Sequence, residues 1–142
     1  PNLGFKESLI PISPSSLAGY VAATGAPLII PDAYLIGDDV PYRFNKSFDR
    51  SFGYVTKSML GLPMKNSHGE VLGVIQLINR KRDFAVKLTS EVVVDANVIS
   101  FDERTEELVS SLASQAAVAL ENFRSKFNTA LGIEAQGFCV LR

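Results

Sequence analysis

The first hydrophobic residues of the chain predict a short helix. Leu17 and Val21 are four positions apart and therefore share one face of a helix. A serine can cap its start, and Gly25 tolerates the left-handed conformation of a C-terminal cap, so we expect a helix over about Ser16 to Thr24. The residues before it, Ser8 to Ile12, are expected to be extended.

Three further apolar runs predict strands. Ser58 to Asn66 and Glu70 to Asn79 are rich in Val, Ile, Leu and Met, and the turn residues 67–69 separate them, which indicates a β-hairpin. The second run is apolar on both faces and is expected to be a central strand. Pro27 to Pro31 predicts a shorter strand. Asp32 to Val55 lacks a clean period, and we interpret this stretch as a partly helical cap on the ligand side.

A long helix is predicted over Phe101 to about Phe127. Ser100 and Glu103 have the spacing of a capping box, and acidic residues fill the first turn. The apolar residues form a stripe wider than one sheet contact needs. We expect one row to pack on the sheet and a second, smaller row to meet the same helix of a symmetry mate in a homodimer. The first row comprises Leu108, Leu112 and Leu120, and the second comprises Val109, Ala113 and Ala117.

Two regions carry weaker patterns. Asn79 to Val98 is a charged excursion whose three consecutive valines could pair as a small extra hairpin. After Asn128 the helical period fails, so we assign residues 1–127 to one domain and residues 128–142 to a tail without a predicted structure.

The composition describes one folded domain. With 142 residues, 46% of them hydrophobic, and a mean hydropathy of +0.16, the chain can bury a core without a disulfide or a metal. Its 14 Lys and Arg against 15 Asp and Glu leave no basic excess, which argues against nucleic acid as a partner. No apolar run reaches the roughly 20 residues that cross a bilayer, so membrane insertion is not expected. The single Cys139 favours a reducing compartment, and we predict a cytoplasmic location.

The chain offers little for catalysis. His68 is the only histidine and sits in a predicted turn, and the phosphate-loop and nucleophile-elbow motifs are absent. Asp32, Asp38, Asp39 and Asp49 lack the EF-hand spacing. We therefore predict no catalytic residue, no metal site and no cofactor.

Gln76 is the unusual residue of the central strand, because a neutral amide among Val, Ile and Leu needs hydrogen-bond partners. Either it binds neighbouring backbone as a core amide, or it forms the floor of a pocket for a polar ligand group. Asp49 and Thr56 could point into the same cavity. The N-terminus of the first helix, Ser16 to Gly19, offers N–H groups that suit a phosphate.

The order of these motifs resembles a GAF domain. The resemblance rests on IPISPSSLAGYVAATGAPLIIPDAY, then RFNKSFDRSFGYVTKSMLGLPMKNSHGEVLGVIQLINR, then FDERTEELVSSLASQAAVALEN, and it covers about Ile10 to Asn122. It implies an α+β fold with an antiparallel sheet of five or six strands flanked by helices, here lacking the family's usual first helix and first two strands. The run from LINRKRDF onward is similar to GAF domains that precede HD-GYP phosphohydrolase domains in bacterial signalling proteins.

The resemblance also implies a function and a site. It makes the chain a non-catalytic regulatory sensor that binds a small molecule such as a cyclic nucleotide and relays the signal to an output domain through its C-terminal helix. The alternative is a ligand-free dimerisation module, and a GAF-type methionine sulfoxide reductase would need more cysteines than Cys139. The ligand contacts carried over are Leu17, Ala18, Asp49, Thr56 and Gln76.

One motif of nucleotide-binding GAF domains, named NKFDE after its residues, is incomplete here. Asn79 is followed by Arg80, and Thr105 and Glu106 stand where the family has Asp and Glu. The buried Lys–Asp pair of the family is therefore not expected to form.

Overall fold

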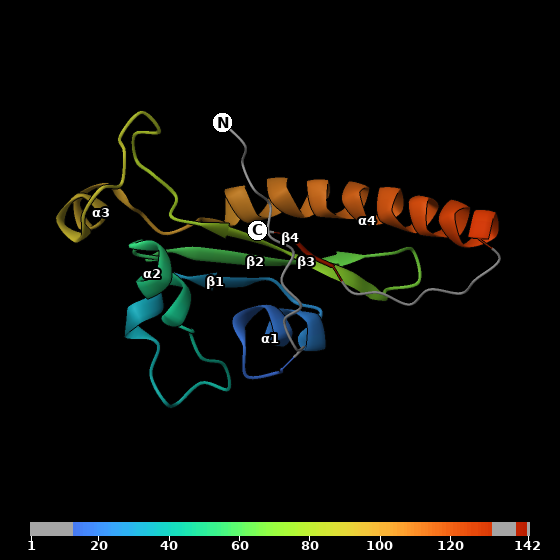
Figure 1. Ribbon diagram of the computed structural model, residues 1–142, viewed down its shortest axis with the longest axis horizontal. Coiled ribbons are helices and arrows are strands. Elements are labelled where there is room, and N and C mark those ends of the chain that lie inside the picture. Colours follow the sequence, from blue (N-terminus) through green and yellow to red (C-terminus); the bar gives the residue numbers. More distant parts are fainter. Residues whose placement is uncertain (1–12, 132–138, 142) are drawn as a thin grey trace.

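The computed structural model describes residues 13–131 and 139–141, with side chains described as far as residue 126. A mixed sheet forms the middle layer, with the long helix α4 on one face and α1 and α2 on the other (Figure 1). Its strands are β1 (Leu28–Ile30), β2 (Met59–Lys65), β3 (Val71–Ile78) and β4 (Cys139–Leu141), in the order β1-β2-β3-β4. The helices are α1 (Leu17–Thr24), α2 (Ser47–Phe52), α3 (Glu91–Asn97) and α4 (Glu103–Leu131), together with the 3-10 turn η1 (Ala33–Leu35).

The predicted first helix and its caps are confirmed. The Ser16 hydroxyl accepts a hydrogen bond from the Gly19 N–H at 3.0 Å, and Gly25 ends α1 at φ 61°. Val21 then packs closely on the sheet, because a Cβ on Gly61 of β2 would lie 2.9 Å from a Val21 methyl. The absence of a side chain at Gly61 thus sets the distance between α1 and the sheet. Residues 8–12 lie outside the described part of the chain.

The predicted hairpin is also confirmed. β2 and β3 pair antiparallel around a turn in which His68 is exposed, with a bulge at Met64 and Lys65. Leu60, Leu62 and Met64 are fully buried on the face toward α4. Gly61 pairs with Gln76, so that Gln76 lies on the opposite face, toward α1.

The α+β class is confirmed, but within the described residues the sheet has four strands, fewer than the five or six predicted. Within the described residues, β1, β2 and β3 are antiparallel, whereas β4 pairs parallel to β3. The cap segment adds no strand, because it folds into η1 and α2 as a partly helical connection. The extra hairpin predicted within residues 79–98 is wrong as well. Its three valines lie in α3, where Ser90 caps the helix and Val94 is buried.

The long helix packs on the sheet through the row that we had assigned to the dimer, and of the predicted sheet row only Leu120 packs there as well. Ala113 and Ala117 are 1% and 0% exposed and contact the cluster around Leu60, whereas Leu108 and Leu112 are 66% and 53% exposed. The large sheet side chains already fill the space below the helix, so only small helix residues fit against them. Within the described residues, no helix is both long enough and apolar enough to cross a bilayer.

The start of α4 also differs from the prediction. Asp102, and not Ser100, caps the helix, because its carboxylate accepts bonds from the Thr105 N–H at 2.8 Å and the Thr105 hydroxyl at 2.6 Å. The Ser100 hydroxyl instead donates to the Phe101 carbonyl. The helix backbone continues to Leu131, four residues beyond the predicted end.

Candidate functional site

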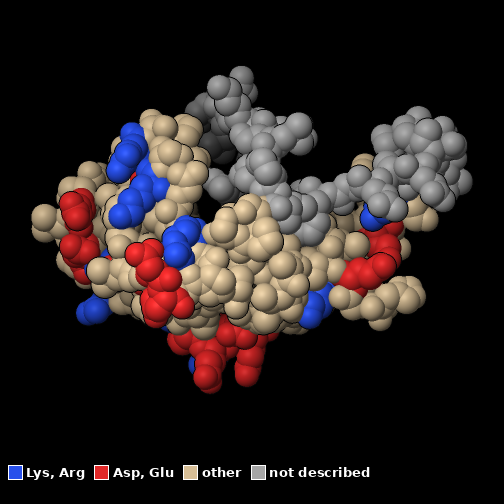
Figure 2. All heavy atoms as spheres, turned by 90° about the horizontal axis from the view of Figure 1, so that it is seen from below, with Lys and Arg blue, Asp and Glu red and all other residues tan. Residues whose placement is uncertain are grey.

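The candidate site lies on the α1 side of the sheet. There Leu17 of α1 packs with Ile30, Ala33 and Met59 in a buried apolar cluster, and Ala18 beside it is half-buried. Viewed from this side, uncharged atoms occupy the middle of the face and charged side chains gather toward its edges (Figure 2). The middle of the molecular surface on this side therefore carries few charges.

Asp49 and Thr56, both predicted site residues, bind each other. Asp49 is 2% exposed, and its carboxylate accepts bonds from the Thr56 N–H at 2.6 Å and the Thr56 hydroxyl at 2.8 Å. The Tyr34 hydroxyl donates a third bond at 2.9 Å. Burial, followed by the bond to Asp49, raises the pKa of Tyr34 above its usual range, because both disfavour the phenolate. Asp49 thus ties η1 and α2 to the segment entering β2.

The structure separates this pair from Gln76. Thr56 lies five residues before Gly61, the cross-strand partner of Gln76, which corresponds to about 16 Å of extended chain. Leu17 is closer, because it packs on Met59, whose partner Ile78 is two residues from Gln76. The predicted residues therefore form two groups: Leu17, Ala18 and Gln76 near the middle of the face, and Asp49 with Thr56 at one end.

Gln76 differs from the other buried polar side chains of the described region. Asp49, Thr56, Ser58, Asn66 and Asn79 all form side-chain hydrogen bonds. Gln76 is 8% exposed, and its amide forms no hydrogen bond to any described residue. No described backbone group thus bonds to the Gln76 amide, and its two interpretations, a core amide or the floor of a ligand pocket, both stay predictions.

Asn79, at the end of β3, was not predicted as a site residue. It adopts the left-handed conformation at φ 55°, which Asn tolerates better than most residues. Its side-chain oxygen accepts from the Lys57 N–H at 2.7 Å, and its amide donates to the Val55 carbonyl at 2.7 Å and the Tyr54 hydroxyl at 2.9 Å. Asn79 thereby holds the backbone on both sides of Thr56.

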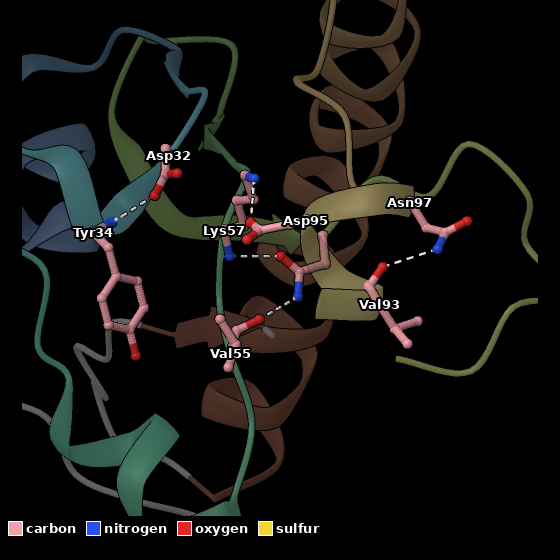
Figure 3. Close-up of polar contacts among 8 residues, drawn as sticks. Asp32, Tyr34, Val55, Lys57, Val93, Asp95 and Asn97 are labelled. Atoms are coloured by element: carbon pink, nitrogen blue, oxygen red, sulfur yellow. Dashed lines mark hydrogen bonds and ion pairs between the residues drawn. The ribbon is translucent and has the colours of Figure 1, made fainter. Parts of the chain in front are cut away.

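Lys57 extends this network to α3. Its ammonium contacts the Asp95 carboxylate at 2.5 Å, and this bond raises the pKa of Lys57 above its usual range (Figure 3). Asp95 is 38 positions away, so no local pattern in the sequence could have identified the contact. Within the described residues, no group of three His, Cys, Asp or Glu is arranged to hold a metal ion.

Arg80 follows Asn79 and reaches the start of α4. Its guanidinium donates to the Ser100 carbonyl at 3.1 Å and to the Asp102 carboxylate at 2.9 Å. Bonds from Thr105, and then the bond from Arg80, lower the pKa of Asp102 to about 2. Arg80 and Asp102 thus form an ion pair at the surface. The buried Lys–Asp pair of the family was not expected here, because Arg80 follows Asn79 in place of the family's lysine.

Comparison with known proteins supports the predicted family and corrects its subtype. A GAF domain model matches residues 2–120. A dual 3',5'-cyclic-AMP and -GMP phosphodiesterase 11 of Drosophila melanogaster is 47% identical over 66 residues, which is 46% of this chain and 4% of the relative. A dual 3',5'-cyclic-AMP and -GMP phosphodiesterase 11A of Takifugu rubripes is 40% identical over 80 residues, which is 56% of this chain and 8% of the relative.

These relatives are animal proteins, and the chain spans less than a tenth of their length. The predicted bacterial type, with a similarity to domains that precede HD-GYP modules, is therefore not supported.

Proposed function

Because the chain belongs to the GAF domain family, we propose that it is a non-catalytic regulatory domain that binds a purine cyclic nucleotide on the α1 side of its sheet. The observation that carries this proposal is the Gln76 amide, which lies on the α1 face of β3, is 8% exposed and has no hydrogen bond to a described residue. A ligand group that donates to and accepts from this amide adds hydrogen bonds that no described residue supplies, and so gains affinity. The names of the two relatives, which include both cyclic nucleotides, support the ligand class.

The chemistry of the face fits a purine. A carboxamide offers one donor group and one acceptor, which match the N6 and N7 edge of adenine. Leu17 and Met59 supply apolar surface for the ring, and Ala18 lies at the start of α1, where helix N–H groups favour a phosphate. In this proposal Asp49 and Thr56 hold the cap segment against the ligand.

The experiment is a thermal-unfolding titration with cyclic AMP and cyclic GMP. At about 100 times its dissociation constant, a ligand adds roughly 2.7 kcal/mol to the stability of the native state. We expect Gln76→Leu to abolish this gain and the exposed control Gln115→Leu to retain it. If Gln76→Leu combined with Thr56→Val binds as tightly as the unmodified protein, the site is elsewhere. If neither nucleotide stabilises the unmodified protein, the ligand class is wrong.

A second candidate function is dimerisation through the outer face of α4. It is favoured by Leu108 and Leu112, whose exposure on an ordered helix leaves apolar surface in water. We expect Leu108→Glu to shift sedimentation of a homodimer toward the monomer, and Val92→Glu, on the exposed side of α3, to leave it unchanged. A chain that is monomeric at high concentration would exclude this function.

We also propose that α4 carries the ligand signal to an output domain and that the protein is cytoplasmic, which suits its single cysteine.

A further inference from the structure

The end of β3 joins two parts of the molecule that are distant in sequence. Asn79 holds the segment entering β2, through bonds to Lys57, Val55 and Tyr54. Arg80, the next residue, holds the first turn of α4. A displacement of the segment entering β2 therefore acts on Asn79. Asn79 is covalently bonded to Arg80, which holds the start of α4.

Each of these attachments is reinforced by backbone bonds. The Asn79 N–H donates to the Ser58 carbonyl at 2.7 Å, and the Arg80 N–H donates to the Ser58 hydroxyl at 3.1 Å. The Arg80 carbonyl accepts from the Ile99 N–H at 2.8 Å, four residues before Glu103, where α4 begins. Asn79 bonds only to the segment entering β2, whereas Arg80 cannot change its backbone conformation without breaking bonds to both segments.

We propose that Asn79 and Arg80 form a coupling element between the Asp49–Thr56 pair and the first turn of α4. Asn79 fixes the backbone around Thr56, and Arg80 fixes the carboxylate of Asp102 that caps the helix. Loosening the backbone around Thr56 therefore also loosens the N-terminal cap of α4, through Asn79 and Arg80. The direction of the signal rests on the proposed function, whereas the coupling does not.

The test needs no ligand. Thr56→Val removes the hydroxyl bond to Asp49, and hydrogen exchange of the Thr105 and Glu106 amides measures opening of the α4 cap. The Ala117 amide in the middle of α4 serves as the internal reference for global unfolding. Relative to that reference, we expect Thr56→Val to speed exchange of the two cap amides by about three- to tenfold.

Arg80→Gln should remove this response, because it removes the link to Asp102. In the Arg80→Gln background, Thr56→Val should change cap exchange by less than about twofold. Asp102→Asn breaks the same ion pair from the other side, keeps an oxygen for the cap, and serves if Arg80→Gln does not fold. Thr89→Val and Arg82→Gln, both at exposed positions of the same excursion, are the matched controls and should behave as the unmodified protein.

Two results would overturn the coupling element: no effect of Thr56→Val on the cap amides, or an equal effect with and without the Arg80–Asp102 pair. A second arm uses cyclic AMP and cyclic GMP. If either binds, we expect it to slow cap exchange in the unmodified protein and to leave it unchanged in Arg80→Gln, with affinity within about threefold. If neither binds, the proposed function fails, while the Thr56→Val result still decides the coupling.

Discussion

Replacing Ala113 by glutamate should destabilise the protein far more than the same replacement at Leu112, the neighbouring residue. Ala113 is 1% exposed and faces the sheet, whereas Leu112, about 100° around the helix, is 53% exposed. Both variants add one negative charge to the same turn, and leucine and glutamate have similar helix propensities. The pair therefore isolates the side of the helix that packs.

The structure sets the expected magnitudes. A glutamate at Ala113 places an unpaired carboxylate against Leu60 and Leu62, which costs several kcal/mol, and the added volume costs about 1–3 kcal/mol more. We expect a loss of about 5 kcal/mol. Leu112 is half-exposed, so Leu112→Glu loses about half the value of a buried leucine, or about 1 kcal/mol.

Urea denaturation measures the difference. With a slope of about 1.5 kcal/mol per M, the midpoint should fall by about 3 M for Ala113→Glu and by less than 1 M for Leu112→Glu. Equal midpoints, or a larger drop for Leu112→Glu, would mean that α4 packs through Leu112 and that the helix orientation described above is wrong.

Three further predictions concern single contacts. The Asp102 pKa of about 2 lies below its ordinary value of 3.8, so the contribution of Asp102 to stability is complete above about pH 4 and is lost as the pH falls toward 2. Urea titrations should show that the stability difference between the unmodified protein and Asp102→Asn shrinks across that pH window. Tyr34→Phe should cost about 1 kcal/mol by thermal unfolding, since it removes one bond to a buried carboxylate from a residue that is 39% exposed. The raised pKa of Tyr34 adds stability that is present below pH 10 and lost as the pH rises further, and an unshifted phenolate absorbance titration would contradict its contact with Asp49. Gly61→Ala should cost about 1–3 kcal/mol against Val21, but nothing further in a Val21→Ala background; an equal cost in both would show that α1 does not set that contact.

Elements with local signals could be predicted from the sequence. Ser16 and Gly25 bound α1 because each satisfies a helix end with its own side chain or backbone, and the hairpin follows from two apolar runs around a turn. The orientation of α4 could not be predicted in this way. Leucine and alanine are both apolar, so periodicity locates the stripe, while the size of Leu60 and Met64 on the sheet selects the row that fits.

In the candidate site, too, local signals could be predicted from the sequence and long-range contacts could not. Asp49 and Thr56 were identified as polar residues near a strand entry, but only the folded chain shows that they bind each other. α3 replaced the expected hairpin because Ser90 caps it and Lys57 pairs with Asp95, a contact across 38 positions. Asn79 and Arg80 were visible only as parts of an incomplete motif, since their partners are distributed between residues 54 and 102.

The length of α4 has a mechanical consequence. Its 29 residues rise about 43 Å, whereas the eight residues of β3 extend only about 26 Å, so one end of the rod must overhang the sheet. For a rod of that length pivoting at its capped end, a tilt of about 5° displaces the far end by about 4 Å. An angular change too small to disturb the close packing of Ala113 and Ala117 is thus geometrically magnified toward Leu131.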